Sequence, residues 1–354
     1  MAQTFSNSRL IAKALAGSWR PFPSPLEISV EELDAATPLL LESGVAALVW
    51  RRLCLSNLKS SRSAFQLQQA SRLHTLQSAV HARNIREVFT LLRSAGIQPI
   101  LVKGWAIARL YPDEGLRPYG DIDLCVSPKQ YLQSKVVLDS EMGKRYLVDL
   151  HQGFVKLDDQ SWPELYSRSR RFRLKDVEVR IPGSEDHLRI LCFHFLREGA
   201  WRPLWLCDIA LALETRPANF DWDLFLGKDP RRRAWFACTI ALAHRLLEVS
   251  LDGIPAAALP QKLPSWFIRS VLCEWEVHSM YERHRTPMAT AWRNPVRAMK
   301  KLRYRWPNAI EGTVSMNGPF NDLPRLPFQL GNCLSRTMEF LWRSAQTPTQ
   351  PPGF

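Results

Sequence analysis

An uninterrupted stretch from Ala64 to Ala95 constrains the fold most, because it contains neither proline nor glycine. Its apolar residues recur at steps of three and four positions, with charged residues between them. This spacing gives a helix one apolar face, and Gly96 is suited to end it. The recurring residues are Leu73, Leu76, Val80, Ile85, Val88, Phe89 and Leu92. The stretch therefore predicts one long amphipathic helix, with at most one break.

An all-helical module is predicted for residues 1–95. The segment from Ser18 to Glu27 is rich in proline, which predicts a surface loop. Ser29 and Glu32 follow it with the spacing of a capping box, which marks the start of a helix.

The pattern changes after residue 95 to short apolar runs separated by polar segments. Strands are predicted at Gln98–Val102, Asp121–Val126, Leu147–Leu150 and Val177–Ile181. A glycine opens a short predicted helix at Trp105–Leu110. Strands and helices this close together predict a small mixed sheet with helices packed on it, over residues 96–182.

Helical patterns return in residues 183–345. Ser184 is followed by two acids, which favour the positive end of a helix. Helices are predicted at 185–198, 203–214, 231–249 and 264–282. The predicted class is therefore α+β, with a small mixed-sheet core flanked by N-terminal and C-terminal helical modules. The last residues, 346–354, have the composition of a disordered tail.

Composition limits the functional classes. The chain has 354 residues, 46% of them hydrophobic, which suffices for a buried core. Its 47 Lys and Arg against 34 Asp and Glu give a net charge of +13, which favours anionic partners such as nucleotides, nucleic acid or acidic lipid. The seven cysteines contain no Cys-x-x-Cys pair, and no stretch reaches 18 apolar residues. These features predict a soluble cytoplasmic protein without a transmembrane segment.

Two acids and a glycine turn form the candidate site. Asp121 and Asp123 are two positions apart on a predicted strand, so their side chains project from one face. Carboxylate oxygens suit Mg²⁺ or Mn²⁺. Lys103 and Gly104 lie at a strand-to-helix turn, where backbone N–H groups can approach a phosphate. Arg117 is a candidate for a further phosphate contact.

This order of motifs resembles the polymerase-β-like nucleotidyltransferase superfamily. It is more closely similar to a nucleotidyltransferase family found beside genes for peptide and polysaccharide biosynthesis. That family has a Lys-Gly, a Tyr-Pro, an Arg-Pro and a Gly-Asp-x-Asp in this order. The matching residues here are Lys103-Gly104, Tyr111-Pro112, Arg117-Pro118 and Gly120-Asp121-Ile122-Asp123.

The resemblance implies a third carboxylate on a neighbouring strand, for which Asp149 is the best candidate. It also implies two magnesium ions held by Asp121, Asp123 and Asp149, and transfer of a nucleoside monophosphate from a nucleoside triphosphate, with ATP expected. The acceptor would be a hydroxyl or phosphate on RNA, a peptide or a polysaccharide precursor. Asp149 is also a candidate base for an acceptor hydroxyl.

The sequence departs from the family at two points. The segment between Asp123 and Asp149 is short, so Asp139 and Glu141 are alternative third acids. The residue after the glycine is Trp105, where the superfamily has a small residue, and phosphate contacts should therefore depend more on Lys103.

Several side chains have more than one interpretation. Lys103 either binds phosphate or pairs with an acid such as Asp121, and Arg117 either binds phosphate or anchors its loop. His151 is a metal ligand, a proton carrier or a structural group. Asp208, a lone acid in an apolar helix, needs a partner if it is buried, with His194, Lys103 and Arg117 as the candidates. His194 itself is expected in the core.

Residues 283–305 form a basic segment with eight Lys and Arg residues and no acid. A helix there would bind RNA, an anionic membrane surface or an acidic protein, or would simply be solvated. Two other functions therefore stay open besides the enzyme. One is a catalytically silent nucleotide-binding or scaffold protein of a biosynthetic cluster, and the other is an RNA-binding, antitoxin-like protein.

Overall fold

The computed structural model describes residues 6–154, 160–276 and 306–346. Its helices are α1 (Ser6–Leu15), α2 (Val30–Glu42), α3 (Ala46–Leu53), α4 (Arg62–Ser94), α5 (Trp105–Ala108), α6 (Tyr131–Leu138), α7 (Trp162–Arg168), α8 (Ser184–Arg197), α9 (Pro203–Glu214), α10 (Trp222–Leu226), α11 (Pro230–Leu247), α12 (Ser265–Trp275), α15 (Ala309–Ser315) and α16 (Leu326–Gln346). Its strands are β1 (Ile100–Leu101), β2 (Ile122–Val126), β3 (Val148–Gln152), β4 (Arg170–Leu174) and β5 (Val177–Ile181). Many helices around two small sheets confirm the α+β class.

Two sequence predictions fall outside the described residues. They are the basic segment 283–305 and, apart from its first residue, the tail 346–354. None of the helices in the described ranges combines the length and the hydropathy needed to cross a bilayer.

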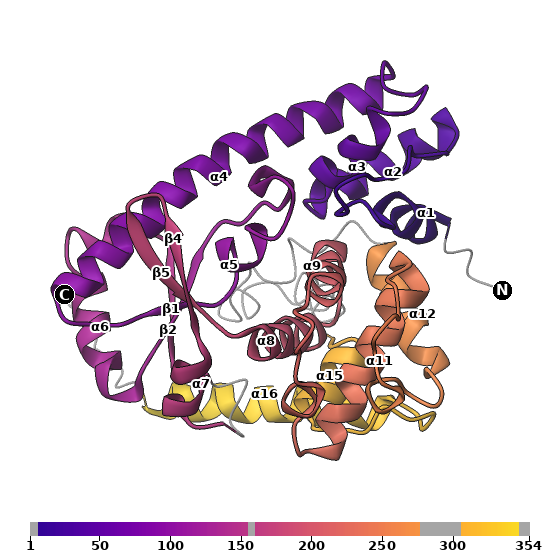
Figure 1. The fold of residues 1–354 in the computed structure, drawn as a ribbon. Helices are drawn as coiled ribbons and strands as arrows, with labels where there is room; N and C mark the ends of the chain where they lie inside the picture. The colour runs from indigo at the N-terminus through magenta and orange to yellow at the C-terminus, as the bar shows by residue number, and fades with distance from the viewer. Residues whose placement is uncertain (1–5, 155–159, 277–305, 347–354) are drawn as a thin grey trace, which may run out of the picture.

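Helix α4 is a single unbroken helix that links the N-terminal helices to the sheets (Figure 1). The hydroxyl of Ser61 caps its start by accepting the N–H of Ala64, and Gly96 follows its end with a φ of 75°. The apolar face predicted for this helix is buried only towards its two ends. Its middle is exposed, with Leu73 53%, Leu76 68% and Val80 57% accessible.

The strands form two sheets. In the first, of order β1-β2-β3, β1 pairs with β2 antiparallel and β2 pairs with β3 parallel. Helix α6 lies in the crossover between β2 and β3, as parallel neighbours require. The second sheet is the β4–β5 hairpin, whose β5 packs beside β1. Strand β4 was not predicted, because three arginines hide the alternation of Phe172 and Leu174.

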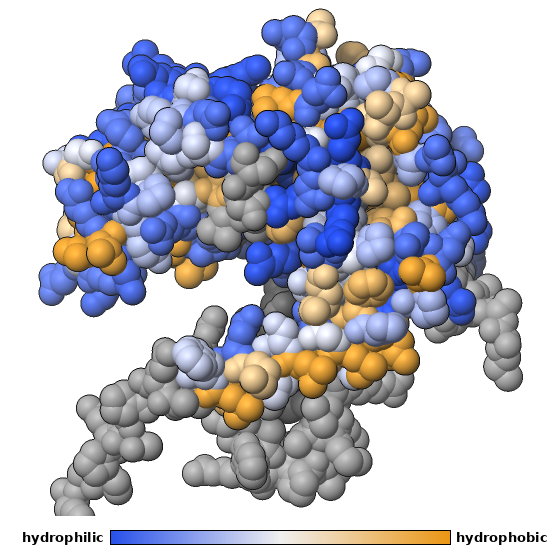
Figure 2. Space-filling model, turned by 90° about the horizontal axis from the view of Figure 1, so that it is seen from below, coloured by the Kyte–Doolittle hydropathy of each residue, from blue (hydrophilic) through white to orange (hydrophobic). Residues whose placement is uncertain are grey.

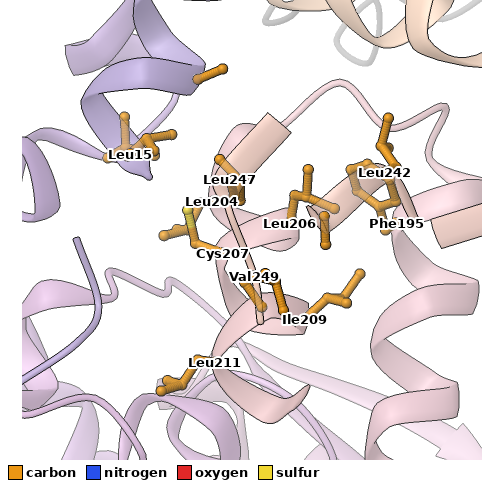
Figure 3. Close-up of a cluster of buried hydrophobic side chains, with 14 of the residues drawn as sticks. Leu15, Phe195, Leu204, Leu206, Cys207, Ile209, Leu211, Leu242, Leu247 and Val249 are labelled. Carbon is orange, nitrogen blue, oxygen red and sulfur yellow. The ribbon is translucent and has the colours of Figure 1, made fainter. Parts of the chain in front are cut away.

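N-terminal and C-terminal helices share one hydrophobic core. Figure 3 shows part of it, with Leu15 of α1 near Leu204 of α9 and Leu247 of α11. A second core lies between the last part of α4 and the sheets. The division into 1–95, 96–182 and 183–345 therefore stays a prediction, and helices from the first and third ranges pack together.

Helix α16 has an exposed apolar face. In the view from below, hydrophobic residues form a row on the surface (Figure 2). The exposed apolar side chains of this helix are Leu326, Leu330, Leu334, Met338, Phe340, Leu341 and Trp342.

We expect stability to fall in weak acid, because buried histidines must stay neutral in the folded chain. Burial, aided by Arg109 and Arg117, lowers the pKa of His187 to about 3, whereas an unfolded histidine titrates near 6.5. The unfolded state therefore binds more protons between these values, and the free energy of unfolding decreases as pH falls from about 6.5. His187→Gln should flatten this slope by up to about 1.4 kcal/mol per pH unit.

Urea unfolding between pH 7.5 and 5 would measure the effect. His244→Gln, at an exposed position, is the control. Equal slopes in wild type and His187→Gln would contradict the assignment.

Candidate active site

Three side chains that can ligate a metal lie together on β2 and β3. The parallel register sets Asp123 opposite Asp149 and Cys125 opposite His151. Nε2 of His151 is 3.1 Å from Oδ2 of Asp149 and 3.7 Å from Oδ1 of Asp123. One ligand atom from each of these three residues lies within 4.8 Å of the others. The side chain of Asp123 is only 3% exposed, whereas that of Asp149 is 52% exposed.

Lys103 follows β1 and forms an ion pair with Asp123. The sequence left two roles open for this lysine, and the acid that it contacts is Asp123 rather than Asp121. Desolvation alone would raise the pKa of Asp123, but His151 and the Lys103 ammonium outweigh it and lower that pKa. Asp123 is therefore ionised inside the protein because cationic and hydrogen-bonding groups surround it.

Asp121 lies just before β2, which begins one residue later than predicted. It lines the same pocket as Asp149 and Lys103, but it is not among the three clustered ligands of the described chain. Desolvation in the pocket, followed by repulsion from Asp123, raises its pKa despite the opposing effect of Lys103. The structure thus brings His151 into the cluster and leaves Asp121 at its edge. Asp139 and Glu141 are exposed and are not part of the cluster.

Gly104 makes the turn between β1 and α5 with a φ of 54° and a ψ of −116°. This backbone conformation favours glycine. A Cβ there would also come 3.3 Å from the ring of Tyr119. Trp105 is buried and donates its indole N–H to Glu114, so its ring is turned into the protein.

Arg117 is buried in a network with Asp208 and Tyr111. Its Nη2 donates to Oδ2 of Asp208 at 2.8 Å, and Tyr111 Oη donates to Oδ1 at 2.9 Å. Burial and the negative charge of Asp208 raise the pKa of Tyr111 far above its ordinary value. Of the two roles left open for Arg117, the geometry favours loop anchoring. The partner of Asp208 is Arg117, so the Tyr-Pro and Arg-Pro motifs tie their loop to α9.

Asp121, Asp149, His151 and Lys103 line a cavity of about 630 Å³, and the nearly fully buried Asp123 is not among its lining residues. The end of α8, the loop after it and α9 also line this cavity, through Arg197, Glu198, Trp201 and Trp205. His194, which was expected in the core, is only half-buried and also lines this cavity. The sequence did not predict the lining residues of the α8–α9 segment as part of the site. They follow Asp123 by more than 70 positions, and only the fold brings them near it.

The site thus combines an acidic cluster, a lysine and a nearby glycine turn with a cavity large enough for a small ligand. Residues 29–248 match the model of a family described as uncharacterised nucleotidyltransferases. This match covers more than half of the chain, so the chain belongs to that family. No curated protein and no solved structure matches the chain significantly.

We expect Asp208→Asn to destabilise the fold strongly, because it leaves the buried Arg117 guanidinium without its carboxylate. Removing one partner of a buried ion pair typically costs about 3–5 kcal/mol. Urea unfolding measures the loss. Asp322→Asn, which breaks an exposed pair with Lys262, is the control and should change stability by less than about 1 kcal/mol. Equal losses in the two variants would contradict the anchoring role.

Proposed function

We propose that this protein is a metal-dependent nucleotidyltransferase that moves a nucleoside monophosphate from a nucleoside triphosphate to an acceptor hydroxyl or phosphate. The observation that carries the proposal is the Asp123, Asp149 and His151 cluster in a cavity of a chain that belongs to a nucleotidyltransferase family. ATP is the expected nucleotide. RNA, peptides and polysaccharide precursors are the acceptor classes to test.

The residues present fit a divalent cation. Two carboxylates and an imidazole offer ligand atoms, and Asp121 adds a third acid to the same cavity. The lining sets the acids Asp121, Asp149 and Glu198 against Lys103 and Arg197, and the buried Asp123 adds a negative charge beside Lys103, so acids outnumber cations around the cavity. Carboxylates suit Mg²⁺ and Mn²⁺ alike, and the imidazole favours Mn²⁺. A cation held by Asp123, Asp149 and His151, with Asp121 beside them, would supply Lewis-acid stabilisation of phosphoryl oxygens.

Lys103, Asp149 and Gly104 each have a different role in this proposal. Lys103 keeps Asp123 ionised and presents an ammonium beside the cavity, where a triphosphate would lie. Asp149 is the most exposed of the clustered groups and is fixed by His151 at 3.1 Å. It is therefore the group best placed to accept a proton from an acceptor hydroxyl. Gly104 keeps the turn beside them free of a side chain.

A catalytically silent nucleotide-binding protein is the second candidate. The contact between the Lys103 ammonium and Asp123 favours it, because a lysine that stays on the carboxylate competes with a cation. The RNA-binding candidate depends on residues 283–305, which lie outside the described residues. We propose the cytoplasm as the location, in line with seven cysteines that are not joined in disulfides.

Incubation with labelled ATP, GTP, CTP and UTP in cell extract, with Mg²⁺ or Mn²⁺, tests the proposal. Wild type should label a product, and Asp123→Asn and Asp149→Asn should each reduce the rate by at least about 100-fold, since each removes a charged ligand. Asp139→Asn is the matched control, because it removes an acid outside the cluster.

Unchanged labelling in Asp123→Asn would reject the role of the cluster. Nucleotide binding by wild type without any labelled product would favour the silent protein.

A further inference from the structure

Trp201 and Trp205 form an aromatic wall in the lining of the same cavity. Both side chains are only half-buried, and both line the cavity. Their ring centroids are 5.2 Å apart at an interplanar angle of 72°, and His194 packs edge-on against Trp205 at 4.4 Å. Edge-to-face contacts of this kind fix ring orientation. The wall is therefore a rigid apolar surface that the folded protein holds ready at an open cavity.

The indole N–H groups of the wall have no acceptor within the described part of the chain. Those of Trp235 and Trp275, by contrast, donate to the carbonyl oxygens of Gly318 and Ala200 at 2.9 and 3.0 Å. A tryptophan whose role is core packing typically finds such a partner when it is buried. Trp201 and Trp205 thus differ from the core tryptophans, because they contribute half-buried ring surface to the lining of the cavity.

The lining of the cavity consequently has two unlike parts. The sheet side of the chain contributes Asp121, Asp149 and Lys103, and the segment from α8 to α9 contributes the two tryptophans beside Arg197 and Glu198. A nucleoside triphosphate is divided in the same way, since its polyphosphate is ionic and its base is planar and apolar on both faces. A cavity of about 630 Å³ is within the usual range for a ligand of this size.

We propose that Trp201 and Trp205 form the subsite that receives the planar base of the nucleotide, while the acidic part of the lining receives its phosphates. This inference rests on the proposed function, because it assigns a further part of the same cavity. Stacking on an aromatic side chain is worth about 1–3 kcal/mol per base and tolerates every base, because each has a π face. The wall therefore accounts for binding of the base without hydrogen-bond readout of its identity.

The test compares a ligand with a base to one without. Isothermal titration with Mn²⁺ present would measure binding of the α,β-methylene analogue of ATP and of inorganic tripolyphosphate. Trp201→Leu should weaken binding of the analogue about 5- to 150-fold and leave tripolyphosphate unchanged. Trp201→Phe, which keeps an aromatic face, should recover most of the affinity. Trp342→Leu removes an exposed tryptophan on α16 and should change neither ligand.

The binding results test the base subsite and the proposed function separately. An equal loss for both ligands in Trp201→Leu, or no loss for the analogue, overturns the base subsite. Normal binding of the analogue with loss of product labelling also overturns it, because the wall would then hold the acceptor. If wild type binds neither the analogue nor tripolyphosphate, the proposed function itself fails, and this result is distinct from the others.

Discussion

Repulsion between carboxylates on neighbouring parallel strands is the constraint on which the site depends. The pairing of β2 with β3 sets Asp123 opposite Asp149, and Asp123 is nearly fully buried. Buried like charges are stable only when positive or hydrogen-bonding groups compensate them. Lys103 and His151 provide part of this compensation, and the acids in and beside the cavity lining still outnumber the lysine and arginine side chains there. The remaining negative charge is what makes a divalent cation the natural complement of this cavity.

The rest of the fold brings the acidic strands and two tryptophans together in the lining of that cavity. The buried contact of Arg117 and Tyr111 with Asp208 ties the loop before β2 to α9. Helix α9 also carries Trp205, so the same network that anchors the acidic strand fixes the position of the aromatic wall. A polar network that is fully satisfied makes such a junction specific and rigid. The helical region is in this sense part of the site and not only a support for the sheet.

Local patterns made much of this architecture predictable. The capping box predicted at Ser29 is present, and Asp123 lies on its predicted strand, whereas Asp121 falls just before that strand. The register that sets Asp149 opposite Asp123 depends on the path of a crossover, so neither the spacing nor the resemblance could give it. The arginines of β4 masked a strand. The contribution of Trp201 could not be read from the sequence, because it arises from packing between distant segments.

Direct titration with Mn²⁺, followed by electron paramagnetic resonance of the free ion, tests the central claim most directly. The account predicts saturable binding by wild type that weakens at least about tenfold in the Asp123→Asn, Asp149→Asn double variant, because both carboxylate ligands lose their charge. Wild type that binds no Mn²⁺, or a double variant that binds it as tightly as wild type, would contradict the account.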